Sequence, residues 1–413
     1  MSDRQHLSSF LRRPILGKDG DRIGRVQDLV ARLGDDAYPP VVGAVIRIEG
    51  RDLFVPARKL AGFEEGSLRF TGRRVDLRKF ERRPGELLLA GDLLAHHLIN
   101  VARGRLVRAH DIELVVAGGG WAVTGVDPRR VGLWRRSASS PHTAAIDFAS
   151  IQPFVGQVPS ARLRIPFRKL ARLHPAQIAD LVEQASHEEG EEIIEAVGLD
   201  RELEADVFEE LDTEHQLEFL EVRSDAEAAR LLARMEPDAA ADLFTEIDQE
   251  RRSPLLDLMP APQQAKMRQL LSYNSETAGG LMSPDFLSVA ATATVDESLA
   301  TVRTSTLPTA ALSTVFLLGA SGEPAGVMAL ADLVRARTGE PALTSARTDV
   351  TCAHPDWDIH QVARTMSDFN LTVLPVVDER DGRMLGIITV DDLLDELLPQ
   401  GWRRDFGMST VEE

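Results

Sequence analysis

Residues 386–395 read Gly386-Ile-Ile-Thr-Val-Asp-Asp-Leu-Leu-Asp395, and their pattern is the clearest structural signal in the C-terminal half. A short apolar strand at 385–388 is followed by the hydroxyl of Thr389 and then by three acids at helical spacing. Thr389 stands where strand gives way to helix, so its side chain can cap the helix and nearby backbone N–H groups can hold an anion. Asp392 falls in the first helical turn, within reach of a ribose hydroxyl or a metal. The stretch indicates a ligand-sensing module, and nothing around it is typical of catalysis.

The same pattern occurs earlier in the chain, which indicates an internal repeat. Gly326-Val-Met-Ala-Leu-Ala-Asp332-Leu matches residues 386–393, and in both copies an apolar strand and a polar turn precede the match. Two β-branched runs joined by turn residues predict a hairpin. A helix is expected before each hairpin, and Thr294-x-x-Glu297 is a capping box for the first of them. The predicted helices span 295–304 and 359–369.

The repeated order of helix, strand, strand and helix resembles a tandem pair of CBS domains, at 281–340 and 341–397. Such pairs bind adenine nucleotides or metal ions, regulate a partner and commonly form homodimers. Where the family pattern has a hydroxyl, the first copy has Ala329 and the second has Thr389. The resemblance therefore implies one complete nucleotide cleft, which Gly386, Thr389 and Asp392 would line. The alternative is a capped helix that binds no ligand.

Composition places the chain among ordinary globular proteins of two to four domains. It has 413 residues, 43% of them hydrophobic and 27% charged. We expect a cytoplasmic protein, because no apolar stretch approaches membrane-spanning length and no secretion signal is present. The single cysteine, Cys352, excludes internal disulfides and fits a reducing compartment. We also expect that the protein is not an enzyme, because the sequence contains no P-loop, dinucleotide fingerprint, Ser-His-Asp elbow or HExxH motif.

The net charge of −18 is unevenly distributed. Residues 1–139 carry 25 basic and 17 acidic side chains, a net charge of +8, and the remainder carries 22 basic and 48 acidic ones, a net charge of −26. An acidic surface repels nucleic acid and attracts cations, so a nucleic-acid partner is not expected.

Residues 160–273 are predicted to form a superhelix of short helices. Four segments begin at Leu173, Leu211, Met235 and Met259, and the last three are 24 residues apart. Each has an apolar residue, a helix-starting Pro or Thr, and an amphipathic helix. Repeated helical units of this kind bury each other's apolar faces. Capping boxes are predicted at Ser186/Glu189, Thr213/Gln216 and Ser224/Glu227.

Pairs of acids in this region lie four residues apart on one helix face, as in Asp238/Asp242 and Glu214/Glu218. Like charges at that spacing destabilise an isolated helix, and many such pairs are simply solvated. The sharper interpretation is that cations bridge them to acids on the CBS pair, because Mg²⁺ is commonly held by one or two carboxylates and several waters.

The join between the two regions reads Tyr273-Asn-Ser-Glu-Thr-Ala-Gly-Gly-Leu-Met-Ser-Pro-Asp-Phe286. An acidic superhelix, this linker and a CBS pair closely resemble the cytoplasmic part of MgtE-type magnesium transporters. The resemblance implies that Mg²⁺ fills an acidic interface and closes the superhelix onto the CBS pair, and that a linker aromatic stacks on the adenine of ATP. Tyr273 matches that aromatic; the alternative is a buried linker tyrosine. The implied metal-binding residues are Asp238, Asp242, Asp391 and Asp395.

In the transporters a membrane domain follows the CBS pair, whereas here only a tail, 398–413, remains. We therefore expect a chain that does not conduct ions itself and is either part of a longer protein or a freestanding regulator. The extension ahead of the superhelix favours the second.

That extension is predicted to be β-rich. The first part has a glycine-rich turn, a strand containing Asp28 and a further pair of strands. A weaker version of this pattern recurs around Asp111. Each of the two patterns resembles a PRC-barrel domain. We assign these domains to 1–80 and 81–139, with strands at 23–30, 39–48, 106–115 and 121–126, and a linker at 140–159. His96-His97 is expected on a helix at the surface, not at a metal site.

The predicted fold is thus multidomain α+β: PRC-like β-barrels, an all-α superhelix, and an α/β CBS pair. The predicted function is a soluble regulator of magnesium homeostasis that binds Mg²⁺ and also ATP or another adenine nucleotide. We expect a homodimer, with a membrane transporter as partner and membrane association only through it. Two alternatives stay open: a nucleotide-sensing CBS regulator with no metal role, and a PRC-based interaction scaffold.

Overall fold

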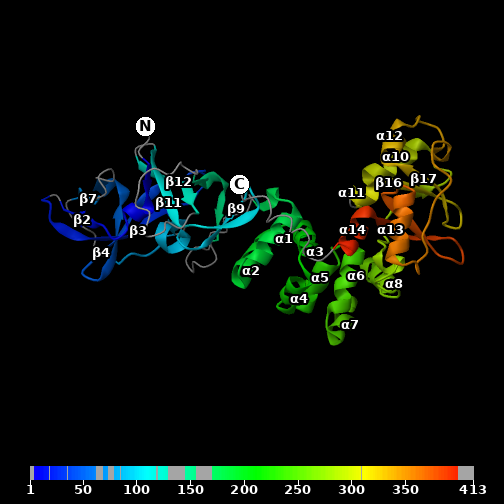
Figure 1. The fold of residues 1–413 in the computed structure, drawn as a ribbon, viewed down its shortest axis with the longest axis horizontal. Helices are drawn as coiled ribbons and strands as arrows, with labels where there is room; N and C mark the ends of the chain where they lie inside the picture. The colour runs from blue at the N-terminus through cyan, green and yellow to red at the C-terminus, as the bar shows by residue number, and fades with distance from the viewer. Residues whose placement is uncertain are drawn as a thin grey trace. The chain divides into compact units, whose positions relative to one another are not determined.

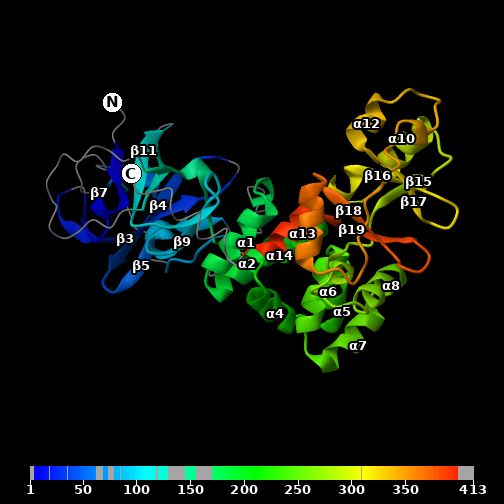
Figure 2. The same cartoon turned by 45° about the vertical axis from the view of Figure 1, so that its right-hand side comes forward.

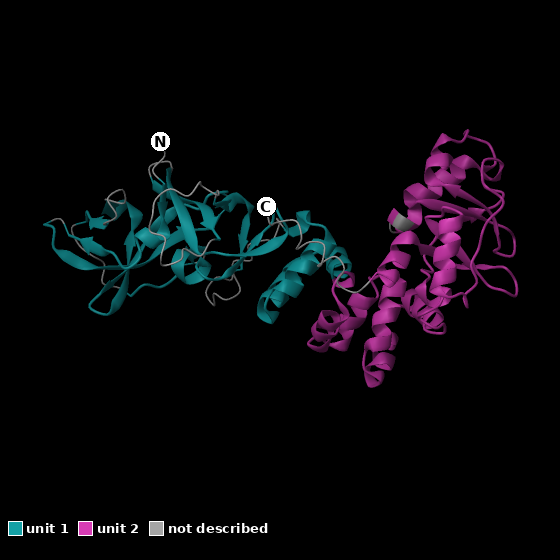
Figure 3. Cartoon of the chain, in the orientation of Figure 1, with its two compact units in different colours: residues 1–207 teal, residues 208–413 magenta. Residues whose placement is uncertain are grey.

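The chain folds into two compact units, residues 1–207 and 208–413, which Figure 3 colours separately. Strands dominate the first unit and helices with two small sheets make up the second (Figure 1). The boundary falls within α3, Arg201–Glu209. The computed structural model describes residues 4–17, 19–34, 36–61, 68–72, 79–83, 85–117, 120–128, 145–154, 170–307 and 309–398.

The first unit begins with a β-rich region in which a hydrophobic cluster of described residues connects distant strands. Its buried cluster extends from Leu7 to Ile151 and includes Phe10, Leu53 and Trp121. The strands are β1 Arg4–His6, β2 Pro14–Leu16, β3 Arg22–Arg32, β4 Val41–Ile48, β5 Arg51–Pro56, β6 Leu60–Ala61, β7 Leu68–Phe70, β8 Glu86–Leu88, β9 His97–Asn100, β10 Arg105–Arg108, β11 Asp111–Ala117, β12 Gly120–Asp127, β13 Ile146–Asp147 and β14 Ile151–Pro153.

These strands form three sheets, and the largest has the order β5-β4-β3-β2-β7-β6 with β8 also paired to β3. The other two have the orders β1-β11-β12-β13 and β10-β9-β14. Short helical turns follow β1, β8 and β13: η1 Leu7–Ser9, η4 Leu89–Leu93 and η5 Phe148–Ser150. Further turns lie at η2 Ala57–Lys59 and η6 Leu170–Arg172.

Three expectations for this region need correction. The strand expected at 106–115 is two strands, because Ala109 leaves the β10 ladder to exchange backbone hydrogen bonds with Ala95 and His96. His97 begins β9 and does not lie on a helix, and its Nδ1 lies 3.2 Å from Glu189 Oε2. Residues 146–153, inside the expected linker, form β13, η5 and β14; the rest of that linker lies largely outside the described residues.

Short helices follow, and two of their starts have the capping boxes that the sequence predicts. Ser186 and Ser224 form capping boxes with Glu189 and Glu227, which satisfies N–H groups that a helix start leaves without partners. The helices of the first unit are α1 Pro175–Gln184 and α2 His187–Val197. Those of the second are α4 Thr213–Glu221, α5 Asp225–Leu232, α6 Pro237–Glu246, α7 Gln249–Leu258, α8 Ala261–Leu270 and the short α9 Ala278–Leu281.

The rest of the second unit consists of two equivalent α/β copies (Figure 2). In the first copy β15 runs parallel to β16, which pairs with β17; in the second, Ala353 takes the place of β15 beside β18, which pairs with β19. The first copy contains β15 Leu287–Ala290, α10 Val295–Thr304, α11 Thr309–Leu312, β16 Thr314–Leu318, β17 Pro324–Ala329, α12 Leu330–Arg335 and η7 Ala342–Thr344. The second contains α13 Ile359–Asp368, β18 Val373–Val377, β19 Met384–Thr389 and α14 Val390–Leu397.

The predicted fold class is confirmed: a strand-rich region, a helical region and a pair of α/β repeats follow one another along the chain. Both predicted helices ahead of the hairpins are present, and the Thr294/Glu297 capping box forms as expected.

Candidate functional site

Two helix starts bring acids together within the second unit. Pro237 begins α6, which suits a residue without an N–H, and Asp238 follows it in the first turn. Asp392 occupies the corresponding turn of α14. One carboxylate oxygen each from Glu236, Asp238 and Asp392 lies within 4.8 Å of the others. Like charges this close need protons or a cation to neutralise them.

Asp238 is the centre of this group. Only 7% of its surface is exposed, and its Oδ1 has no hydrogen-bond partner among the described residues. Burial, followed by the negative charges of Asp392 and Glu236, raises the pKa of Asp238 well above its usual range. A buried carboxylate oxygen without a donor is costly, and a bound cation would remove that cost.

A second acid pair lies further along the same two helices. Asp242 follows Asp238 by four residues on α6, and Glu396 follows Asp392 by four on α14. Partial removal of the Asp242 carboxyl from water, followed by the negative charge of Glu396, raises the pKa of Asp242 to about 6. Asp242 and Glu396 nevertheless keep enough exposed surface for an ion to reach this pair from solvent. We call these two groups, Glu236/Asp238/Asp392 and Asp242/Glu396, the acid seam.

Thr389 and Asp392 bind each other across the start of α14. The Thr389 N–H donates to Asp392 Oδ2 at 2.9 Å, and the Asp392 N–H donates to Thr389 Oγ1 at 3.3 Å. Burial raises the pKa of Asp392, although the hydrogen bonds from Thr389 oppose the shift. The cap fixes one carboxylate oxygen of Asp392 and leaves the group facing Asp238.

Gly386, a predicted nucleotide contact, lies against the chain that enters the first copy. Ser283 and Ile387 exchange two backbone hydrogen bonds of 2.8 Å, and a Cβ at Gly386 would lie 2.6 Å from the Ser283 carbonyl oxygen. The glycine therefore permits close backbone packing, which is a sufficient structural reason for its presence.

Tyr273 is half-buried and packs on the linker. A Cβ at Gly279 would lie 2.7 Å from the Tyr273 ring, so the ring covers this glycine. The linker is held to the second copy by the N–H groups of Ala278 and Gly279, which donate to the carbonyls of Trp357 and Pro355 at 2.8 and 2.9 Å.

The predicted metal ligands are only partly brought together. Asp238 and Asp242 lie on the seam, whereas Asp391 and Asp395 are exposed and belong to no described three-carboxylate group. Asp392, predicted to contact nucleotide, instead belongs to the same carboxylate group as Asp238. Sequence reasoning missed Glu236 and Glu396. The shared four-residue spacing of 238/242 and 392/396 was the signal that could have identified Glu396.

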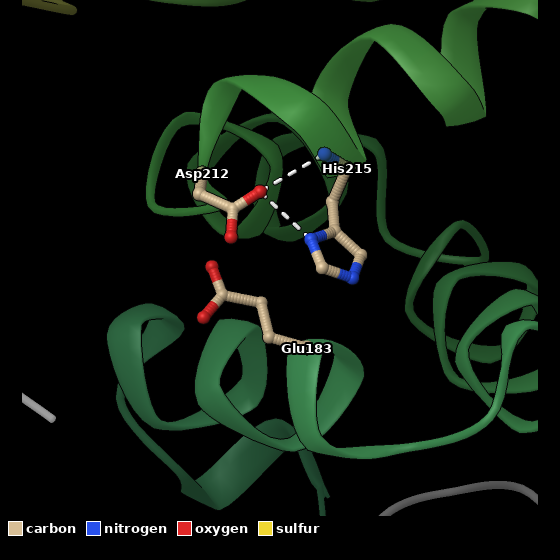
Figure 4. A group of neighbouring side chains, drawn as sticks. All are labelled: Glu183, Asp212 and His215. Atoms are coloured by element: carbon tan, nitrogen blue, oxygen red, sulfur yellow. Dashed lines mark hydrogen bonds and ion pairs between the residues drawn. The ribbon is translucent and has the colours of Figure 1, made fainter. Parts of the chain in front are cut away.

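Asp212 and His215 form another acid–histidine pair, drawn in Figure 4. Asp212 Oδ1 accepts the His215 backbone N–H at 2.9 Å and lies 2.7 Å from His215 Nδ1. Asp212 is thus the N-cap of α4, and the capping box predicted at Thr213/Gln216 is wrong by one residue. Gln216 instead donates to the Phe208 carbonyl at 2.8 Å.

Comparison with protein families identifies two parts of the chain. The model of the MgtE intracellular N domain matches residues 173–276. The CBS domain model matches residues 344–399. Residues 173–399 have the domain order of an MgtE cytosolic region. Neither matched domain is a catalytic family.

Relatives and solved structures agree with this assignment. Magnesium transporter MgtE of Thermus thermophilus is 30% identical over 218 residues, which are 46% of this chain and 48% of the relative. The Bacillus subtilis MgtE is 26% identical over 193 residues, 47% of this chain and 43% of the relative. The chain therefore spans about half the length of these relatives.

Two solved structures match the MgtE-like region. The cytosolic domain of the Mg²⁺ channel MgtE in complex with ATP is 29% identical, with a TM-score of 0.51, covering 56% of this chain and 93% of that one. The soluble part of a magnesium transporter is 25% identical with the same TM-score, covering 55% and 89%. Within the described ranges, no helix combines the length and apolar character that crossing a bilayer requires.

Proposed function

We propose that this chain is a non-enzymatic magnesium sensor in which Mg²⁺ binds the acid seam and controls a partner. The observation that carries the proposal is the buried Asp238 carboxylate, whose Oδ1 has no described donor and which faces Asp392 and Glu236. Carboxylate oxygens are the ligands that Mg²⁺ prefers. The proposed ligands are Asp238, Asp392 and Glu236, with Asp242 and Glu396 as a second, more open position.

The seam would act as a switch because its acids repel one another without a cation. Mg²⁺ neutralises them and favours contact between α6 and α14. A ligand that binds one state only, at a concentration 100 times its Kd, stabilises that state by about 2.7 kcal/mol. That is enough to invert a two-state equilibrium that starts near ten to one against closure.

The names of the relatives support a cellular location and a partner for this switch. Their names describe magnesium transporters, and the matched structure is a cytosolic domain, so we place this chain in the cytoplasm with a membrane transporter as partner. We further propose a homodimer through the CBS pair. The half-exposed apolar side chains of Leu394 and Leu397 on α14 support such a surface. We assign the β-rich region to a pair of PRC-like repeats.

Calorimetric titration with Mg²⁺ tests the proposal. Asp238→Asn should remove the tightest binding event, because the amide keeps the shape of the carboxylate but not its charge. Asp391→Asn is the matched control, since Asp391 is an exposed acid on the same helix as Asp392, and it should bind Mg²⁺ as the unaltered chain does. Equal binding by all three proteins would exclude the seam as the site.

A second ligand, ATP, is supported by the half-buried Tyr273 beside the linker and by the ATP in the matched structure. In the alternative function the chain senses an adenine nucleotide with no metal role. Calorimetry with ATP, ADP and AMP, each with and without Mg²⁺, separates the two. Tyr273→Ala should weaken nucleotide binding alone. A chain that binds neither ligand would favour the scaffold interpretation.

A further inference from the structure

The β-rich region has two halves, a first half from β2 to β7 and a second half from β9 to β14. The segment that precedes the first half completes the second, and the segment that precedes the second half completes the first. Residues 4–9, called strap 1, precede the first half but pair with β11 of the second. Residues 86–93, called strap 2, precede the second half but pair with β3 of the first. In both cases an antiparallel strand runs directly into a short helical turn.

The straps bind their grooves through equivalent carboxylates. Asp28 accepts the N–H groups of Ala90 and Gly91 in strap 2, at 2.7 and 2.8 Å. Asp111 accepts the N–H of Ser8 in strap 1 at 3.1 Å, and also its hydroxyl. Each aspartate additionally accepts the N–H of the residue that follows it, at 2.7 and 2.8 Å. Both aspartates are buried.

The strand registers are equivalent as well. Leu88 lies opposite Val30, two residues beyond Asp28, and His6 lies opposite Glu113, two residues beyond Asp111. Leu88 is the residue immediately before η4, and His6 is the residue immediately before η1. The two straps therefore bind their two grooves in equivalent registers.

The chain leaves both straps in the same way. Arg12 and Ala95 follow the two turns, and both have positive φ, 63° and 65°, a conformation uncommon for residues other than glycine. Their N–H groups donate to the carbonyls of Val26 and Ala109 at 2.9 and 2.8 Å. Val26 and Ala109 each lie two residues before the strap-binding aspartate.

We infer that the β-rich region is one unit built by reciprocal exchange, and that β11 with Asp111 forms a strand-binding groove that strap 1 occupies. A shared core that extends from Leu7 to Ile151 is the packing expected of such a unit. The half that strap 1 completes also carries His97, which contacts Glu189 at the start of α2. Opening of strap 1 therefore loosens the half that touches the helical region.

Hydrogen exchange of the full chain tests the exchange pattern. Asp111→Asn removes the charged acceptor for Ser8, so exchange in residues 4–9 and 111–117 should accelerate about tenfold or more, while residues 86–93 keep their protection. Asp28→Asn should give the reverse, accelerating 28–32 and 86–93 and sparing 4–9. Asp21→Asn, an exposed aspartate on the same hairpin, is the control and should change neither strap.

Ser8→Ala removes one hydroxyl only and keeps the test valid if Asp111→Asn unfolds the region. It should accelerate residues 4–9 and 111–117 several-fold, in the same pattern. The inference is overturned if Ser8→Ala leaves residues 111–117 unchanged while it frees residues 4–9, or if the aspartate variants each affect the strap of their own half.

Discussion

The two α/β copies share their strand pairing but differ where a helix begins. Both hairpins have a register shift at the corresponding place, between Leu317 and Leu318 and between Val376 and Val377. The first copy starts α12 from Ala329 without a side-chain cap, whereas the second starts α14 from Thr389 with a full capping box. The fold therefore does not require the hydroxyl.

In the second copy, Asp392 is held in one position and faces helix α6. Asp392 is held by its cap and lies beside Asp238, whereas its counterpart Asp332 is 61% exposed in its side chain and pairs only loosely with Arg335, at 3.9 Å. The same position in two repeats is thus a surface residue in one and part of the acid seam in the other. The two copies therefore keep one fold but place this acid in different surroundings.

The largest effect should come from removing the acid that distinguishes the copies. Asp392→Asn should abolish the Mg²⁺ response of the chain, because it takes away a charge that the cation would neutralise. Asp332→Asn, its counterpart, should leave the response intact. Calorimetry and Mg²⁺-dependent protease sensitivity measure the response of both variants. A full Mg²⁺ response in Asp392→Asn would contradict the proposed difference between Asp392 and Asp332.

The two equivalent glycines should differ in their tolerance of alanine. A Cβ at Gly386 would lie 2.6 Å from the backbone oxygen of Ser283, which two backbone hydrogen bonds to Ile387 hold in place. Gly386→Ala should cost about 1–3 kcal/mol. A Cβ at Gly326 would first meet the end of the flexible Leu343 side chain, at 2.8 Å, so Gly326→Ala should cost less. Thermal unfolding of the full chain compares them, and the reverse order would contradict the packing described here.

The cap itself should contribute about 1 kcal/mol. Thr389→Ala removes the N-cap hydroxyl and should destabilise α14 by about that amount. The complementary change, Ala329→Thr, should protect α12 by up to about 1 kcal/mol if the introduced hydroxyl adopts the rotamer of Thr389. Hydrogen exchange in residues 390–397 and 330–335 measures both helices in one experiment. Equal protection of α14 with and without Thr389 would show that the cap is dispensable.

Without Mg²⁺, the contact between α6 and α14 should weaken as the pH rises. Burial, aided by Glu396, raises the pKa of Asp242 to about 6 from an ordinary value of 3.8. The folded state therefore holds an extra proton between these values, and that stabilisation is lost as the pH passes through 6. Protection of residues 237–246, corrected for intrinsic exchange, should fall between about pH 4 and 6 and level off above that range. Asp242→Asn should reduce this fall, to which Asp238 and Asp392 also contribute because their pKa values are raised too, and α12 should show none.

Repetition in the sequence made much of this architecture predictable. The match of 326–333 with 386–393 predicted both hairpins and their helices, and the linker after Tyr273 identified the MgtE-like region. Caps were predictable where one residue alone fits, as at Ser186. At Asp212-Thr213 two adjacent residues can both cap a helix, and pattern alone chose the wrong one.

Tertiary pairings were less accessible from sequence. Glu236 and Glu396 join the acid seam because α6 and α14 meet, and even the spacing that points to Glu396 does not show that these two helices meet. The straps were missed for the same reason. Ser8 and Asp111 are over a hundred residues apart, and their hydrogen bond depends on how two β halves exchange segments.

The most direct test of the central claim is hydrogen exchange of the unaltered chain during a Mg²⁺ titration. We predict that residues 237–246 and 390–397 gain protection together, at one midpoint, while residues 330–335 of the first copy do not change. Protection that is independent of Mg²⁺ in both helices, at concentrations where calorimetry detects binding, would contradict the proposal that the acid seam is the magnesium switch.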